Sequence, residues 1–272
     1  MPVAIVLVLV AVGSVVFHFL SPWWWTPIAS NWQYIDHTLI ITFWITGAVF
    51  VAVVLFMGYC IYRFHHVQGR TAHYEPENKK LESWLTVITA VGVAAMLAPG
   101  LFVWHQFVTV PPDATEIEVV GRQWQWSYRL PGKDGKLGAS DVRNISDSNP
   151  LGLDPKDRHG QDDVVIESDD LHIPLGKPVK VLLRSIDVLH DFYVPEFRAK
   201  MDMIPGSVTY YWLTPTRTGK FEVLCAELCG VAHSQMRGTV VVDGQVAYDE
   251  WLQKQKTFAE LSARSKTAKA AD

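Results

Sequence analysis

Long uncharged stretches occupy the first part of the chain. Before Arg63, Asp36 is the only Asp, Glu, Lys or Arg. A helix needs about 20 apolar residues to cross a bilayer, and three stretches are candidates: residues 1–20, 38–62 and 84–104. Two such runs side by side are rare in the core of a soluble protein. The second and third therefore predict a transmembrane helical hairpin within residues 38–107.

Residues 1–37 form an N-terminal hydrophobic segment that fits either a signal peptide or an extra transmembrane helix. The apolar run is long enough for a span, and no Lys or Arg precedes it. The segment also lacks a convincing small-x-small cleavage site. We therefore favour its retention over its removal.

The charges of the loops indicate the orientation of the hairpin. Lys and Arg concentrate in cytoplasmic loops, and they occur between the two spans but not in residues 21–37 or 105–121. We expect a multi-pass protein of the bacterial inner membrane whose later residues lie on the periplasmic side. The basic residues of the loop between the two spans are Arg63, Arg70, Lys79 and Lys80. The tryptophans expected at the membrane interfaces are Trp23, Trp24, Trp25 and Trp104.

The exported part, residues 108–245, has the pattern of an all-β domain. Turn-forming pairs such as Pro205-Gly206 and Asp243-Gly244 separate short apolar or alternating runs. This spacing predicts an antiparallel sandwich or barrel. The runs lie at residues 116–120, 178–183, 208–213, 220–224 and 238–242.

Two further segments, one within the β domain and one after it, lack the strand pattern. Residues 144–160 are polar and rich in turn formers, so we expect a surface excursion. Residues 246–272 predict one helix, over about residues 247–265, followed by a basic tail.

Residues 225–236 concentrate metal-binding side chains. Cys225, Cys229, His233 and Met236 supply two thiols, an imidazole and a thioether. Such soft ligands favour copper over magnesium or calcium. The window follows one expected strand and precedes another, so these side chains share a loop.

Four interpretations of the two cysteines are open. A disulfide is common in exported domains but gives His233 and Met236 no role. Zinc rarely takes Met as a ligand, and the chain has no second Cys pair. A mononuclear blue-copper site would leave one thiol unused. Two thiolates that bridge two copper ions use every ligand in the window, so we favour a dinuclear site.

A dinuclear site needs a further nitrogen donor. His190 follows the expected strand at residues 178–183 and is the best candidate. His172 and His159 lie in polar, turn-rich sequence, so we expect ordinary surface histidines there. Cys60 lies in the second span and is expected to be a reduced bystander.

These residues resemble subunit II of cytochrome c oxidase, a heme-copper oxidase component whose exported cupredoxin domain holds a dinuclear copper centre, CuA. The resemblance covers roughly residues 38–242 and includes the hairpin and residues 225–236. It also includes residues 121–128 (GRQWQWSY), residues 190–197, and Met-Ile-Pro-Gly at residues 203–206. It implies a membrane-anchored all-β protein with two or three N-terminal transmembrane helices, a cupredoxin-like antiparallel β-sandwich and a C-terminal helix.

The resemblance also implies a set of ligands. Cys225 and Cys229 would bridge the two coppers, and His190 and His233 would each bind one. Met236 would be a weak axial ligand. Glu227 would bind copper through its backbone carbonyl, and its side chain would face a magnesium ion at the junction with subunit I.

Further roles are implied around the expected donor surface. Trp124 would receive electrons from cytochrome c, and we expect it to share a strand face with Trp126. Arg122 and Gln125 depart from the His and the aromatic residue usual in the family. The acidic residues 161–170 would steer a basic cytochrome c if they lie near Trp124, and otherwise form a solvated surface.

Glu82 stands just before the third apolar stretch. By resemblance it would lie at the cytoplasmic mouth of a proton path, and an ordinary interfacial glutamate is the alternative.

The chain is thus expected to be subunit II of a membrane-bound cytochrome c oxidase. It would pass electrons from cytochrome c to heme in subunit I, which reduces oxygen to water, and subunit III is a further expected partner. The spans have no set of histidines suited to heme. A membrane-tethered copper carrier or assembly protein is the alternative, whereas a quinol oxidase subunit would lack the copper ligands. The 49% hydrophobic content and net charge of −4 argue against a nucleic-acid binder.

Overall fold

The structure is a computed structural model that describes residues 2–21, 26–71, 73–167 and 170–269. The chain divides into a helical unit, residues 1–25 and 34–104, and a β unit, residues 26–33 and 105–272. Trp23, Trp24 and Trp25, expected at a membrane interface, lie outside the described residues.

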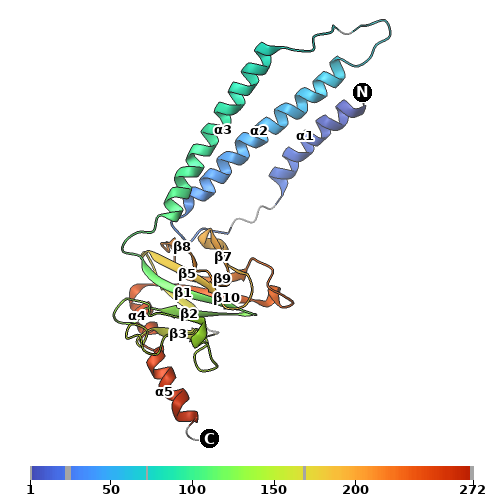
Figure 1. Cartoon of the computed structure of the whole chain (residues 1–272). Helices are drawn as coiled ribbons and strands as arrows, with labels where there is room; N and C mark the ends of the chain where they lie inside the picture. Colours follow the sequence, from blue (N-terminus) through green and yellow to red (C-terminus); the bar gives the residue numbers. More distant parts are fainter. Residues whose placement is uncertain (1, 22–25, 72, 168–169, 270–272) are drawn as a thin grey trace. The chain divides into compact units, whose positions relative to one another are not determined.

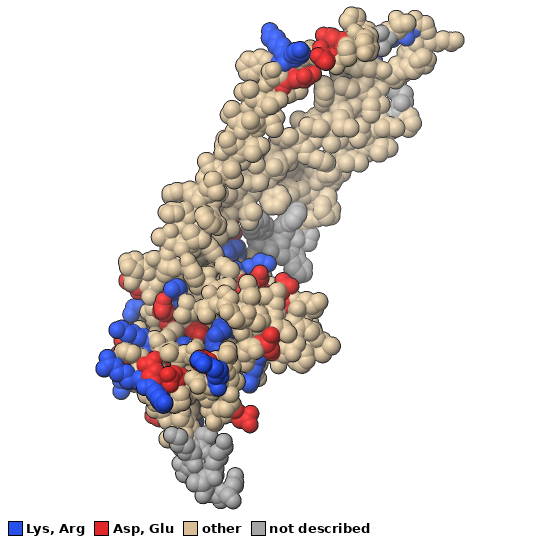
Figure 2. Space-filling view, viewed as in Figure 1, with Lys and Arg blue, Asp and Glu red and all other residues tan. Residues whose placement is uncertain are grey.

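Three long helices confirm the expected apolar stretches (Figure 1). All three are long and apolar enough to cross a membrane, judged by length and composition. Figure 2 shows that charged side chains are absent from the middle of these helices and gather at the α2–α3 connection and over the β unit. The helices are α1 (Pro2–Leu20), α2 (Gln33–Arg63) and α3 (Lys79–Val108), which includes the exposed Trp104.

The first helix packs closely against the second. Gly58 of α2 faces α1, and a Cβ added there would lie 3.5 Å from the carbonyl oxygen of Ala4. Ala4 and Ala11 are the buried residues of α1. Small residues at a helix crossing allow such close approach in membranes. Helix α1 therefore has the packing of a spanning helix.

The β unit contains two five-stranded sheets, as expected for a β-sandwich. One sheet has the strand order β3-β2-β1-β5-β8, and the other has the order β4-β10-β9-β6-β7. The pairs β1–β5 and β10–β4 are parallel, and the other strand pairs are antiparallel. The strands are β1 (Thr115–Arg122), β2 (Gln125–Leu130), β3 (Val164–Glu167), β4 (Leu171–Pro174), β5 (Val179–Ser185), β6 (His190–Val194), β7 (Ala199–Met203), β8 (Thr209–Leu213), β9 (Gly219–Cys225) and β10 (Arg237–Asp243).

Apolar strand residues form the core of the sandwich, and Val119 of β1, Leu183 of β5 and Val223 of β9 are fully buried. Burial alternates along part of β9, as the period of two predicts, but not along β1, where five consecutive residues are buried. The five runs expected from the sequence all lie within strands, to within two residues at each end.

The excursion between β2 and β3 is tied to the sandwich by buried charges. The Arg129 guanidinium contacts Glu118 at 2.9 Å and Asp163 at 2.8 Å, and Arg184 reaches Glu118 at 3.1 Å. These four side chains are at most 10% exposed. Asp163 also accepts a hydrogen bond from the backbone N–H of Gly138. The acidic run at residues 161–170 is therefore not simply a solvated surface.

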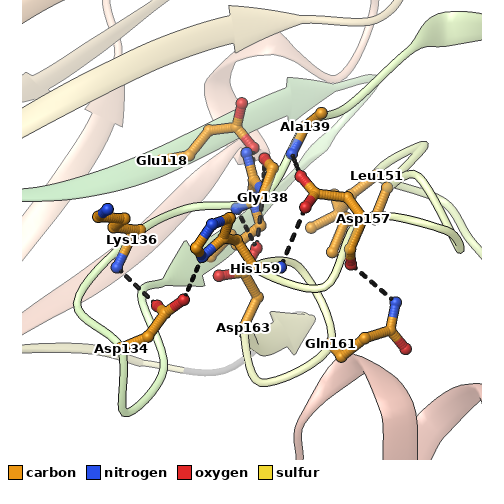
Figure 3. A network of polar contacts seen from close by, with 12 residues as sticks. Glu118, Asp134, Lys136, Gly138, Ala139, Leu151, Asp157, His159, Gln161 and Asp163 are labelled. Atoms are coloured by element: carbon orange, nitrogen blue, oxygen red, sulfur yellow. Dashed lines mark hydrogen bonds and ion pairs between the residues drawn. The ribbon is translucent and has the colours of Figure 1, made fainter.

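Aspartate side chains order the outer part of the same excursion (Figure 3). Asp134 contacts the His159 ring at 2.5 Å and accepts the backbone N–H of Lys136. Asp157 accepts the backbone N–H groups of Ala139 and His159. These bonds replace the regular backbone pairing that the segment lacks.

The C-terminal segment is helical, as expected, but it forms two helices instead of one continuous helix. They are α4 (Gln245–Leu252) and α5 (Phe258–Lys269). Thr257 and Glu260 form a capping box, in which each backbone N–H donates to the other's side chain, at 2.9 and 3.4 Å. Thr257 also bridges to Val164 of β3. These contacts start a new helix and place Phe258 in a small core with Leu151 and Leu153.

Residues 26–33 belong to the β unit and form a strap along its edge. Ser30 pairs with Pro215 just after β8, and the indole of Trp32 donates to the carbonyl of Trp212 at 2.9 Å. Arg198 binds the carbonyl of Thr26 at 2.7 Å. Ser30 and Trp32 are buried.

Candidate metal centre

Strand pairing brings the predicted ligands together. His190 begins β6 and Cys225 ends β9, and the antiparallel register places Phe192 opposite Cys225. The loop after β9 then returns to β10, and the backbone N–H of Cys225 donates to the carbonyl of Met236 at its end. The sandwich thus closes one loop around all the donors.

Six donor atoms converge where this loop meets the start of β6. The Cys225 and Cys229 sulfurs lie 3.7 Å apart. Nδ1 of His190 lies 4.0 Å from the Cys225 sulfur, and the Glu227 carbonyl oxygen lies 3.2 Å from it. The Cys229 sulfur lies 3.6 Å from Nδ1 of His233 and 3.8 Å from the Met236 sulfur. Every ligand expected from the resemblance is therefore at the site.

The site suits a soft metal and is shielded from water. His190, Cys229 and Met236 are 0%, 3% and 1% exposed. Cys225 and Cys229 are free cysteines, and their separation is far from the 2.05 Å of a disulfide. Two thiols, two imidazoles, a thioether and a carbonyl form a donor set that fits copper.

The two thiols differ in acidity. Burial would raise the pKa of Cys225, but hydrogen bonds with the His190 ring and nearby backbone outweigh it and lower the pKa to about 6. Burial, followed by the neighbouring Cys225 thiolate, raises the pKa of Cys229. One thiolate therefore forms readily, and the second requires a compensating cation such as a metal ion.

Asp187 orients the buried histidine. Its Oδ1 lies 2.8 Å from Nε2 of His190, and its Oδ2 accepts the backbone N–H of Gln123 at 2.7 Å. Burial would raise the pKa of Asp187, but these hydrogen bonds and that from Val188 lower it. An ionised carboxylate at Nε2 leaves Nδ1 of His190 free to bind a metal.

The two tryptophans of the GRQWQWSY segment do not share a strand face, contrary to expectation. Gln123 and Trp124 form the turn between β1 and β2, where Arg122 pairs with Gln125. Trp124 is therefore 37% exposed, whereas Trp126 in β2 is 3% exposed and packs edge-on to His190. The turn lies beside the metal loop, and the Trp124 indole donates to the carbonyl of Cys229 at 3.3 Å.

The remaining predicted residues have varied surroundings. Glu82 lies in the first turn of α3, where its carboxylate accepts the backbone N–H of Asn78 at 3.3 Å. His172 pairs with Asp243 and stacks on Trp251, so these contacts give it a structural role. His159 pairs with Asp134 in the excursion. Neither histidine is among the residues that could share a metal with Cys225 and Cys229, within the described part of the chain.

Two residues at the site were missed by the sequence interpretation. Asp187 precedes His190 by three residues, and a carboxylate so close to a ligand histidine is a recurrent orienting partner. That spacing was an available signal. Gln123 contacts the metal loop across more than a hundred residues of sequence, so no local sequence pattern indicated this contact.

Comparisons with known proteins agree with this geometry. The family described as "Cytochrome C oxidase subunit II, periplasmic domain" matches residues 115–244. The alternative cytochrome c oxidase subunit 2 of Bradyrhizobium diazoefficiens is 71% identical over 99% of this chain and 98% of its own length. The chain belongs to the cytochrome c oxidase subunit II family. It is therefore a membrane-anchored subunit with a periplasmic domain of this family.

More distant members and solved structures are also similar to the chain. Cytochrome c oxidase subunit 2 of Cereibacter sphaeroides is 27% identical over 84% of this chain and 77% of its own length. The crystal structure of the periplasmic domain of subunit II (CoxB) of Bradyrhizobium japonicum is 28% identical. It covers 53% of this chain and 95% of its own, with a TM-score of 0.40.

Proposed function

We propose that the chain binds a dinuclear copper centre of the CuA type and relays electrons from cytochrome c to heme in subunit I. The main support is the convergence of six donor atoms from His190 of β6 and from Cys225, Glu227, Cys229, His233 and Met236, which lie between the end of β9 and the start of β10. When bound, the copper pair would supply reversible one-electron transfer.

The predicted ligands would contribute to metal binding in different ways. The sulfurs of Cys225 and Cys229 are neighbours, so their thiolates would bridge, while Nδ1 of His190 lies next to the Cys225 sulfur and Nδ1 of His233 next to the Cys229 sulfur. The Met236 sulfur lies 3.8 Å from the Cys229 sulfur, and Met236 would be a weak axial donor. Burial excludes water, which keeps the ligand geometry fixed when charge is gained or lost.

Trp124 would receive the electron from cytochrome c. Its ring is partly exposed, and its indole nitrogen bonds to the carbonyl of a bridging ligand. The exposed Leu228 and Val231 in the metal loop add apolar surface next to Cys229 and Gly230 in the chain. Of the acidic run, Asp163 is buried against Arg129 and Asp170 pairs with Lys220, which leaves fewer free charges to attract a basic donor.

Further assignments follow from membership of the family. The side chain of Glu227 would bind magnesium at the boundary with subunit I, since carboxylate oxygens suit this ion. Glu82 would stand at the mouth of a proton path. Subunit III would be a further partner, and the membrane would be the bacterial inner membrane. We also infer that α1 remains in the mature protein, because its small residues pack against Gly58.

A metal count and electron paramagnetic resonance of the purified full-length protein test the copper proposal. We expect two copper ions per chain and a hyperfine pattern shared equally between two copper nuclei. Cys225→Ser should abolish both, whereas Cys60→Ser in α2 should leave both intact. A single copper per chain would instead favour a copper carrier, and an oxidised Cys225–Cys229 pair in the working complex would contradict the proposal.

A further inference from the structure

The turn at Gln123 and Trp124 approaches the metal loop unusually closely. The side-chain amide of Gln123 donates to the Cys229 carbonyl at 2.7 Å, and the Trp124 indole donates to the same oxygen at 3.3 Å. The next residue of the loop is Gly230, with φ +121°. A Cβ there would lie 2.9 Å from the Gln123 amide nitrogen and 3.2 Å from the Trp124 ring. The contact therefore depends on a glycine at this position.

The backbone of Gln123 is held from a second direction. Its N–H donates to Asp187 at 2.7 Å, and the same carboxylate contacts His190 at 2.8 Å. Gln123 is thus joined to His190 through its main chain and to Cys229 through its side chain. His190 belongs to β6, and Cys229 belongs to the loop after β9. These hydrogen bonds consequently fix the turn to both His190 and the metal loop.

Trp124 has weaker restraints of its own. Trp124 is 37% exposed, and its indole hydrogen bond to the Cys229 carbonyl, at 3.3 Å, is longer than the 2.7 Å bond of Gln123 to the same oxygen. A partly exposed side chain with one long bond gains little from that bond, because its rotamer freedom opposes it. The neighbouring Gln123 bond is therefore the stronger restraint on where the ring lies.

We propose that Gln123 is a positioning residue that holds the Trp124 ring against the Cys229 carbonyl for electron transfer. The inference rests on the proposed electron-accepting role of Trp124. Gln123 itself contacts neither the donor nor the metals. Its amide fixes the turn, and the turn fixes the ring.

Gln123→Met tests the inference, because methionine keeps the length and apolar stem of glutamine but cannot donate a hydrogen bond. In the assembled oxidase, we expect unchanged copper content and an unchanged paramagnetic resonance spectrum. We expect kcat with cytochrome c to fall about tenfold and KM to stay the same, since a displacement of about 1 Å is enough for such losses. Gln245→Met on α4, remote in the sequence, is the matched control and should leave kcat unchanged.

Hydrogen exchange of the metal-free full-length chain gives a second readout that does not depend on turnover. Gln123→Met should remove protection from the backbone amides at residues 123–125, and Gln245→Met should not. Gly230→Ala should displace the turn from the other side and cause the same loss of protection.

Three results would overturn the inference. Unchanged kcat and unchanged protection in Gln123→Met would show that the Trp124 indole holds its own position. Loss of copper in Gln123→Met would show that Gln123 supports the ligand loop instead. A raised KM would place Gln123 in donor docking. If wild-type protein failed to bind two coppers, the proposed function would fail, while the exchange measurement on metal-free protein would still test the contact.

Discussion

Nε2 of His190 lies 2.8 Å from Oδ1 of Asp187, three residues earlier in the chain. Because Nδ1 of the same ring faces the Cys225 sulfur, the carboxylate selects the tautomer that presents Nδ1 to a metal. Orienting partners of this kind raise the basicity of a ligand histidine and fix its ring.

Asp187→Asn should therefore weaken copper binding without removing any ligand. We expect about a tenfold loss of copper affinity, the lower end of the range for lost orienting partners. Competition with a copper chelator would measure it. Asp134→Asn, which alters the Asp134–His159 pair of the excursion, is the control, and an equal loss there would reject the specific role of Asp187.

Met236→Leu should leave copper bound and change its electronic properties. The Met236 sulfur approaches the site only beside Cys229, as expected for a weak axial donor, and such donors tune the reduction potential. Spectroelectrochemistry would detect a shifted midpoint potential. Met203→Leu, another buried methionine of the β unit, should cause no shift. Complete loss of copper in Met236→Leu would contradict the prediction and show that Met236 is a strong ligand.

Arg129→Met should strongly destabilise the β unit. The substitution leaves Glu118 and Asp163 buried without their shared partner, and breaking a buried pair in this way costs about 3–5 kcal/mol. Urea unfolding of the full-length protein would measure the change. Arg143→Met removes the exposed ion pair with Asp141 and should have little effect. Similar midpoints for both variants would show that the buried charges add no stability.

Acid should loosen the outer excursion before the sandwich unfolds. The His159 ring and a backbone N–H lower the pKa of Asp134, and Arg143 lowers that of Asp141 to about 2. A lowered folded-state pKa contributes stability above the ordinary carboxyl pKa, and this contribution is lost as pH falls through the folded value. Hydrogen exchange at residues 131–163 should thus rise as pH drops from about 4 to about 2, after correction for the intrinsic rate.

The pKa shift of Asp163 has the opposite direction, because burial raises the pKa of this carboxyl. Its protonation would favour the folded state as pH falls, so the acid effect should be confined to the outer excursion. Corrected exchange that does not change in this pH range would show that the aspartate contacts do not order the segment.

Local sequence patterns were sufficient to predict the spans, the main strands and the loop that carries most of the candidate ligands. The helical stretches have continuous apolar composition, and the ligands between Cys225 and Met236 are close in sequence, so neither depends on distant pairing. His190 was chosen because it is a nitrogen donor that follows an expected strand. Its approach to Cys225 results from pairing between β6 and β9, which the sequence does not encode locally.

The errors arose where a nonlocal or capping contact decided the structure. The expectation that Trp124 and Trp126 share a strand face failed because β1 and β2 form a hairpin that closes with the Arg122–Gln125 pair, which places Trp124 in the turn. The break before α5 depends on the Thr257–Glu260 capping box, a signal visible in the sequence but outweighed by the apolar spacing around it. The parallel pairs β1–β5 and β10–β4 join segments far apart in the chain.

The strap at residues 26–33 has a consequence for any truncated form of the protein. It covers polar backbone groups beside β8, the last strand of its sheet, and buries Trp32 against Trp212. A fragment beginning at residue 105 would leave that border uncovered and open to association with other chains. Solubility of the isolated periplasmic portion thus depends on a peptide encoded before the second membrane helix, and fusing residues 26–33 to it should prevent self-association.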